Sequence, residues 1–137
     1  MKAVSALLFA CALLIPFTAA QARLGETQEQ IQERYGKPVS VNKPAAVALH
    51  RWNDYYIRVE YRDGRAVLLG YRRRDKQPMT EQETNAALAR HAGASEWLAK
   101  PPAPGFRKWR SADGARQARY STVNGLLTFA PRSSAES

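Results

Sequence analysis

The sequence predicts an α+β fold in which two short helices pack on an antiparallel β meander. Capping-box patterns occur at Thr27 and Thr80, where a threonine is followed three residues later by Gln or Glu. Apolar and polar residues alternate over 55–62, which is the period of a strand with one buried face. Asp-Gly and Asn-Gly pairs mark hairpin turns, the first of them at 63–64.

The N-terminal segment 1–22 has the three regions of a secretory signal peptide in order. Lys2 supplies the positive start, an apolar run follows over 3–17, and Ala20-x-Ala22 fits the small-residue rule for cleavage. The run is shorter than the ~20 apolar residues of a bilayer span, which favours cleavage over a membrane anchor. We therefore expect an exported bacterial protein, periplasmic or secreted, with no transmembrane span after processing.

A lipidated cysteine directly follows the apolar run of its signal peptide. Cys11 lies inside the run, so lipidation is not expected. We expect a single α+β domain over 23–130, followed by a disordered tail over 131–137. The chain has 137 residues and Cys11 is its one cysteine, so the processed domain would fold without a disulfide. That length is sufficient to bury a core without one.

The first half of the domain is predicted to begin with a two-turn helix over 28–35. Thr27 is its N-cap, and Gly36 supplies the left-handed residue that ends it. Because so short a helix is not stable alone, it is expected to pack on the sheet. Val39 and Val41 extend the chain, and strands are expected over 46–52, 55–62 and 65–71.

The turn at 63–64 allows two registers for its hairpin. A two-residue loop would place Val59 opposite Leu68. A three-residue loop with a bulge at Gly64 would place Val59 opposite Val67 and bring the larger apolar side chains onto one face. Because a slip by one residue turns that face outward, we expect the three-residue loop.

The second half is predicted to begin with a helix from the Thr80 capping box to about His91, ended by Gly93. A helical turn is expected over 95–100, and a stiff proline-rich connector follows it. Strands are expected over 106–111, 115–121 and 126–129. Each half thus has a Thr-capped helix and an Asp-Gly hairpin, which leaves open a degenerate α-β-hairpin duplication.

The segment Gly25-x-Thr27-x-x-x-Ile31-x-x-x-Tyr35-Gly36-x-Pro38 resembles the opening helix of two families. These are the SmpA/OmlA-type outer-membrane assembly lipoproteins and the β-lactamase-inhibitor-protein-like domains. The resemblance covers about 24–71 and implies a short helix leading into an antiparallel meander. The lipoproteins would carry a lipidated cysteine at the mature N-terminus, where this chain has Arg23. The inhibitors work through a large exposed face, and no functional residue is carried over from either family.

The sequence contains no pattern of catalytic or metal-binding residues, so no metal or cofactor is expected. His50 and His91 have no Cys, His or carboxylate at ligand spacing. One enzymatic alternative remains open, a small hydrolase whose acidic pair, Asp54 and Glu60, is assembled only in the fold. Otherwise the chain is expected to be non-enzymatic.

Basic residues supply the positive functional signal, since the whole chain has a formal net charge of +9. One group surrounds the first hairpin and forms the predicted binding residues: Tyr56, Arg58, Arg62, Arg72, Arg73 and Arg74. A second group surrounds a later hairpin: Arg107, Lys108, Arg110, Arg116 and Arg119.

These groups predict a binding module whose sheet face meets an acidic protein or an envelope polymer. Nucleic acid is not expected as a partner, because the protein is expected to be exported. Two alternatives stay open. The charges are simply a solvated face and edge that deter aggregation, or the protein inhibits a secreted enzyme.

Overall fold

The computed structural model describes residues 24–93 and 95–132. The predicted signal peptide over 1–22 lies outside these residues, as does the predicted tail from 133 onward. The described elements are α1 (Gln28–Tyr35), β1 (Ser40–Asn42), β2 (Val47–Trp52), β3 (Tyr55–Arg62), β4 (Arg65–Arg73), α2 (Glu81–Arg90), β5 (Trp97–Ala99), β6 (Phe106–Ser111), β7 (Arg116–Ser121) and β8 (Leu126–Pro131).

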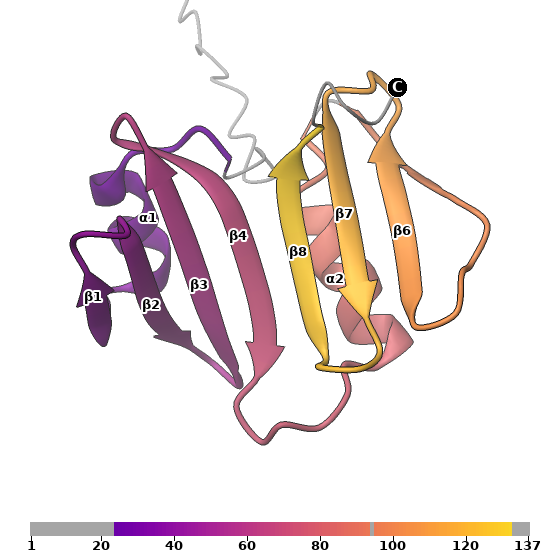
Figure 1. The fold of residues 1–137 in the computed structure, drawn as a ribbon, viewed down its shortest axis with the longest axis horizontal. Helices are drawn as coiled ribbons and strands as arrows, with labels where there is room; N and C mark the ends of the chain where they lie inside the picture. The colour runs from indigo at the N-terminus through magenta and orange to yellow at the C-terminus, as the bar shows by residue number, and fades with distance from the viewer. Residues whose placement is uncertain (1–23, 94, 133–137) are drawn as a thin grey trace, which may run out of the picture.

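The strands form one eight-stranded antiparallel sheet in the order β1-β2-β3-β4-β8-β7-β6-β5 (Figure 1). Each half of the described chain is a helix followed by four strands, and the halves meet where β4 pairs with β8. The broad prediction of two short helices on an antiparallel sheet is confirmed, although strands make up far more of the fold than helices.

The repeated topology does not match the hairpins that suggested a duplication. Asp63-Gly64 joins β3 to β4, the last two strands of the first half, whereas Asp113-Gly114 joins β6 to β7. The position equivalent to Asp63-Gly64 is the β7–β8 turn with Asn124-Gly125. The predicted alignment of the two Asp-Gly hairpins was therefore wrong, even though both halves have the same order of elements.

Both helices begin where their capping boxes predict. At α1, the Thr27 hydroxyl accepts from the Gln30 N–H at 3.4 Å, and the Gln30 side chain accepts from the Thr27 N–H at 2.9 Å. At α2, Thr80 and Glu83 make the same reciprocal pair, with both distances 3.1 Å. Each pair satisfies two N–H groups that a helix start leaves without partners.

The predicted register of the β3–β4 hairpin was wrong. Arg62 pairs with Arg65, so the loop has two residues, and both Asp63 and Gly64 have positive φ, as a type I′ turn requires. The bulge lies further along, at Val67 of β4 opposite the step from Glu60 to Tyr61, and shifts the pairing so that Val59 faces Leu69. The extra residue on β4 brings the larger apolar side chains onto one face. The prediction had expected a bulge at the turn to have this effect.

The predicted helical turn over 95–100 is instead the edge strand β5, which pairs antiparallel with β6. Trp97 holds it in place, because the indole N–H donates to the Leu88 carbonyl of α2 at 2.8 Å. The last strand also runs further than predicted, since β8 includes Pro131 and the Arg132 N–H bonds to Ala115 O at 2.9 Å. The boundary expected at 130 therefore lies inside a strand.

The core lies between the helices and one face of the sheet. Both helices are on that side of the sheet, which is the far side in Figure 1. Ile31 of α1 and Leu88 of α2 are buried with Ile57, Leu69 and Phe129 of the strands. Neither helix covers the other face. Among the described residues no helix is long and apolar enough to cross a membrane.

The two halves are also joined by buried polar groups. The Tyr35 hydroxyl of α1 is hydrogen-bonded to the Tyr71 hydroxyl of β4. Tyr71 in turn contacts Nε2 of His91, at the end of α2, with 2.6 Å between the two atoms. A single tyrosine on a central strand therefore links both helices beneath the sheet.

Candidate functional site

The face of the sheet that neither helix covers is called the open face here. Side chains alternate along a strand, so the buried Ile57 and Val59 of β3 assign the helix side. Tyr56, Arg58 and Glu60 then point to the open face. The same alternation, carried through the strand register, assigns every strand residue to one face or the other.

Cations dominate the open face. Glu60 is the one carboxylate that the described strands place there, and it forms an ion pair with Arg58 at 2.9 Å. The cations of the open face are Arg51, Arg58, Arg62, Arg65, Arg72, Lys100, Lys108, Arg110, Arg119 and Arg132.

The binding residues predicted from the sequence divide into two sets. Four of them share the open face: Tyr56, Arg58, Arg62 and Arg72. Arg73 does not, because it follows Arg72 and points to the helix side. Arg74 lies beyond the end of β4, where its guanidinium donates to Asn53 O at 3.2 Å. The run of three arginines is therefore not one cluster.

Arg73 is held by two carboxylates on the helix side. It lies 2.6 Å from Asp75 and 2.7 Å from Glu83 of α2. Burial raises the pKa of Glu83, but hydrogen bonds from the Tyr55 hydroxyl, the Thr80 N–H and Arg73 outweigh it and lower that pKa to about 2. This arginine connects the sheet to α2 and has no role on the open face.

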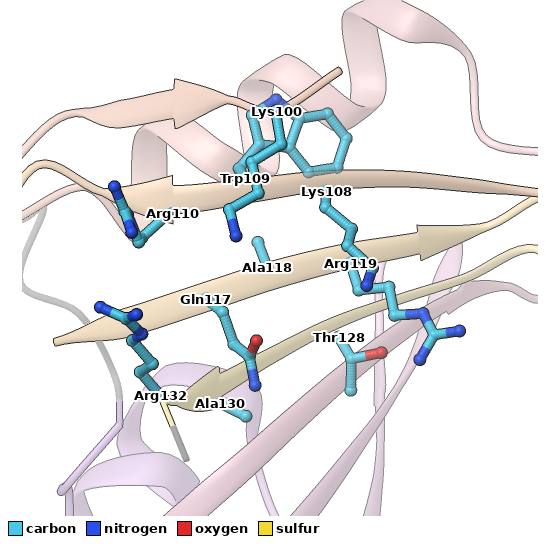
Figure 2. Close-up of a pocket in the computed structure, with 10 residues that line it drawn as sticks. All are labelled: Lys100, Lys108, Trp109, Arg110, Gln117, Ala118, Arg119, Thr128, Ala130 and Arg132. Carbon is cyan, nitrogen blue, oxygen red and sulfur yellow. The ribbon is translucent and has the colours of Figure 1, made fainter. Parts of the chain in front are cut away.

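A hollow of about 470 Å³ lies on the open face of the second half (Figure 2). Its rim is basic, and its floor consists of small or uncharged side chains. The residues lining it are Lys100, Lys108, Trp109, Arg110, Gln117, Ala118, Arg119, Thr128, Ala130 and Arg132. Lys108, Arg110 and Arg119 belong to the second basic group noted in the sequence.

Lys100 and Arg132 were missed by the sequence analysis. Lys100 lies beside β6, where its N–H donates to Lys108 O at 2.9 Å, but the segment was expected to be helical. Arg132 follows β8, in a segment that was expected to be disordered. A prediction of strands in both places would have brought both side chains to this face.

The register lines up cations across the sheet. Lys108 of β6 faces Arg119 of β7, and Arg119 faces Thr128 of β8. Thr128 faces Gly70 of β4, and Gly70 faces Arg58 of β3. This row therefore runs from the hollow to the first basic group over two small residues.

Four cations of the hollow have no carboxylate partner among residues 24–93 and 95–132. These are Lys100, Lys108, Arg110 and Arg119. The Arg119 guanidinium lies over the Phe106 ring, 3.7 Å from its centroid, a cation–π contact that leaves the charge in place. The hollow is therefore a region of positive potential.

Arg107 and Arg116 were predicted to join this second group but lie on the helix side. Arg107 stacks over Trp109, with 5.0 Å to the ring centroid. Arg116 donates to the carbonyls of His91 and Ala92 at the end of α2, the latter at 2.8 Å. Cations at a helix C-terminus are stabilising, so Arg116 has a structural role.

The acidic pair considered for a hydrolase is not brought together. Asp54 precedes β3 and Glu60 lies near its other end. Six residues at about 3.3 Å each separate them by roughly 20 Å, twice the distance that paired glycosidase carboxylates tolerate. Within the described ranges, no group of three or more His, Cys, Asp or Glu side chains is placed to hold a metal.

His50 is fully buried, with Nδ1 2.8 Å from Gly36 O. Burial lowers its pKa, against the opposing effect of the Gly36 carbonyl. It borders a second hollow of about 320 Å³ between α1 and the β1–β2 hairpin. His91 is equally buried and bonds to Tyr71, so both histidines belong to the core.

Comparison of the chain with protein-family models, with curated proteins and with solved structures found no match.

Proposed function

We propose that this protein is a small, exported, non-enzymatic binding module whose open face binds an acidic partner in the periplasm or outside the cell. The observation that carries the proposal is the charge of that face, where Glu60 is the one carboxylate that the described strands add to many lysines and arginines. A surface of one sign attracts partners of the opposite sign and speeds their association.

A solvated face that only deters aggregation would be built differently. Protective charges belong on the edge strands of a sheet, which here are β1 and β5. Arg58, Arg72 and Arg119 lie instead on the interior strands β3, β4 and β7. Soluble surfaces usually intersperse charges of both signs, whereas this face is almost uniformly basic. Both features favour binding over simple solubility.

The proposal is tested by retention on immobilised polyanions at low and high salt. We expect binding that weakens steeply with salt, because screening acts on exposed charges. The variant Arg58→Gln/Arg119→Gln removes two charges from the open face and is expected to elute earlier. A matched control, Lys37→Gln/Lys76→Gln, removes two charges outside the strands and should change retention little. Failure of the unmodified protein to bind any polyanion would overturn the proposal.

A second candidate, inhibition of a secreted enzyme, uses the same face. Eight strands at about 4.8 Å spacing make the sheet roughly 34 Å wide. This is about the width of the patch that one partner contributes to a standard protein interface. Assays of secreted hydrolases with acidic surfaces test this candidate. Stoichiometric inhibition that Arg58→Gln/Arg119→Gln relieves would favour it, and an absence of inhibition at saturating protein would exclude it for those enzymes.

A further inference from the structure

We infer that the basic hollow over β5–β8 is the anchoring subsite for an anionic polysaccharide, whose oxyanion groups it binds. This inference rests on the proposed function and specifies both the partner and the part of the open face that dominates binding. Three features of the hollow support it, namely the arrangement of its cations, its polar floor, and its lack of exposed aromatic or large apolar side chains.

The cations are spaced to contact neighbouring oxyanions. Lys108 and Arg119 lie on adjacent strands, about 4.8 Å apart in backbone spacing, and Arg110 lies two residues beyond Lys108 on the same face. Arginine binds carboxylate and sulfate oxygens with two parallel N–H donors, and lysine adds a mobile point charge. Since no carboxylate in the part of the chain that the structure describes forms an ion pair with these side chains, an external anion is their natural partner.

The floor of the hollow is suited to hydroxyl groups. Gln117 and Thr128 lie between the basic side chains, with Gln117 between Arg132 and Arg119 in the view of Figure 2. Both are half-buried, and neither side chain bonds to another residue that the structure describes. An amide and a hydroxyl left open in a hollow recognise ligands that both donate and accept hydrogen bonds. Sugar hydroxyls do both at every ring, whereas the carboxylate side chains of an acidic peptide only accept and its backbone N–H groups are the donors.

Other acidic macromolecules fit the hollow less well. Protein interfaces rely on aromatic or large apolar anchors in pockets, but the floor here is Gln117, Thr128 and Ala130. Single-stranded nucleic acid needs exposed rings on which bases stack. Trp109 is only 6% exposed, and the Phe106 ring is covered by Arg119. A hydroxylated, anionic chain is the class that these side chains match.

The open face also gives such a chain a path beyond the hollow. From Arg119 the row passes Thr128 and Gly70 to Arg58, three strand spacings or roughly 14 Å away. Gly70 has no side chain on this face, and the Leu126 side chain lies beside it. A Cβ at Gly70 would come within 3.3 Å of the Leu126 side chain. A polymer that follows this row from the hollow to the first basic group therefore passes the Leu126 side chain beside Gly70.

The test measures affinities of the whole protein for three probes of matched charge and length. These are a sulfated heparin oligosaccharide, an oligogalacturonate and a polyglutamate peptide. The two saccharides distinguish sulfate from carboxylate as the oxyanion, and the peptide carries carboxylates without sugar hydroxyls. We expect at least one saccharide to bind about tenfold more tightly than the peptide, which is the contribution of one or two hydrogen bonds.

Variants locate the site. Arg119→Gln is expected to weaken saccharide binding about tenfold, whereas Arg72→Gln, on the open face of the other half, weakens it only about twofold. Thr128→Val keeps the shape of the floor and is expected to reduce saccharide binding without changing peptide binding. Thermal melting of each variant checks that it is folded.

The outcomes separate this inference from the proposed function. Equal affinity for peptide and saccharides, or equal losses from Arg119→Gln and Arg72→Gln, would overturn the polysaccharide subsite and leave a general acidic partner. Binding to none of the three probes would remove the proposed function as well.

Discussion

Lys108 of β6 lies directly opposite Arg119 of β7 on the open face. Like charges in direct cross-strand positions destabilise a sheet, by up to about 1 kcal/mol relative to neutral pairs. No described carboxylate forms an ion pair with either side chain. The fold tolerates this pair in the middle of its basic hollow, which suggests that the charges are retained for a partner and not for stability.

Reversing one of these charges is expected to raise stability while it weakens polyanion binding. Lys108→Glu would replace the repulsion with an ion pair to Arg119, raising the free energy of unfolding by about 0.5–1 kcal/mol. Urea denaturation at low salt measures this, and high salt should reduce the gain. The same variant should bind polyanions more weakly. A variant that is less stable than the wild type would contradict our account of the pair.

Tyr71→Phe is expected to cost about 1–3 kcal/mol of stability, because it removes the hydroxyl that bonds to both Tyr35 and His91 in the core. Chemical denaturation measures the loss. Tyr56→Phe, on the open face, serves as the control and should change stability little. If the two variants were equally stable, the buried link between the helices would have no energetic role.

Low pH is expected to destabilise the protein, because it protonates the carboxylates that form ion pairs with Arg73. Folding lowers the pKa values of Glu83 and Asp75 to about 2, from ordinary values of 4.5 and 3.8. Lowered carboxyl pKa values stabilise the fold above the ordinary values, and that contribution is lost as the pH falls toward 2. Denaturation between pH 7 and pH 2 measures the loss.

Glu83→Gln tests which carboxylate is responsible, since glutamine keeps the capping box but has no charge. It is expected to be less stable than the wild type at pH 7 and to lose less stability on acidification. Glu81→Gln, two residues earlier on the exposed side of α2, is the control. Identical pH profiles for wild type and Glu83→Gln would show that Glu83 does not contribute.

Arg116→Lys is expected to destabilise the protein by about 1–2 kcal/mol without affecting binding. The guanidinium donates to two carbonyls at the end of α2 and stacks over Trp97 at 4.9 Å, and an ammonium cannot reproduce both contacts. Thermal melting and polyanion affinity are measured together. Arg110→Lys, in the hollow, should leave the melting temperature nearly unchanged. If Arg116→Lys were fully folded but bound polyanions more weakly, Arg116 would belong to the binding site.

Local signals in the sequence predicted the helices well, because each capping box is complete within four residues. Thr27 and Thr80 begin α1 and α2 as expected. The hairpin strands were also found, since period-two alternation is local. The β3–β4 register was not predicted correctly. The bulge at Val67 depends on packing against the helices and not on the Asp63-Gly64 turn.

The candidate site was only partly predictable for the same reason. Alternation correctly separates Arg58 and Arg62 from their buried neighbours, and it also separates Arg72 from Arg73. Contiguity in the sequence had grouped Arg72, Arg73 and Arg74 together. The hollow depends on β5 and on the end of β8, which pair with the neighbouring strands β6 and β7 but have weak local signals. Lys100 and Arg132 could be assigned to the open face only when those strand pairings were known.

The most direct test of the central claim is the salt dependence of polyanion affinity in a variant with a neutralised open face. Arg58→Gln/Arg72→Gln/Arg110→Gln/Arg119→Gln removes cations from both halves of the face and leaves the core untouched. We predict a large loss of affinity at low salt and a much shallower slope of log affinity against log salt, because fewer counterions are exchanged on binding. An unchanged affinity and slope in the folded variant would show that the partner binds elsewhere.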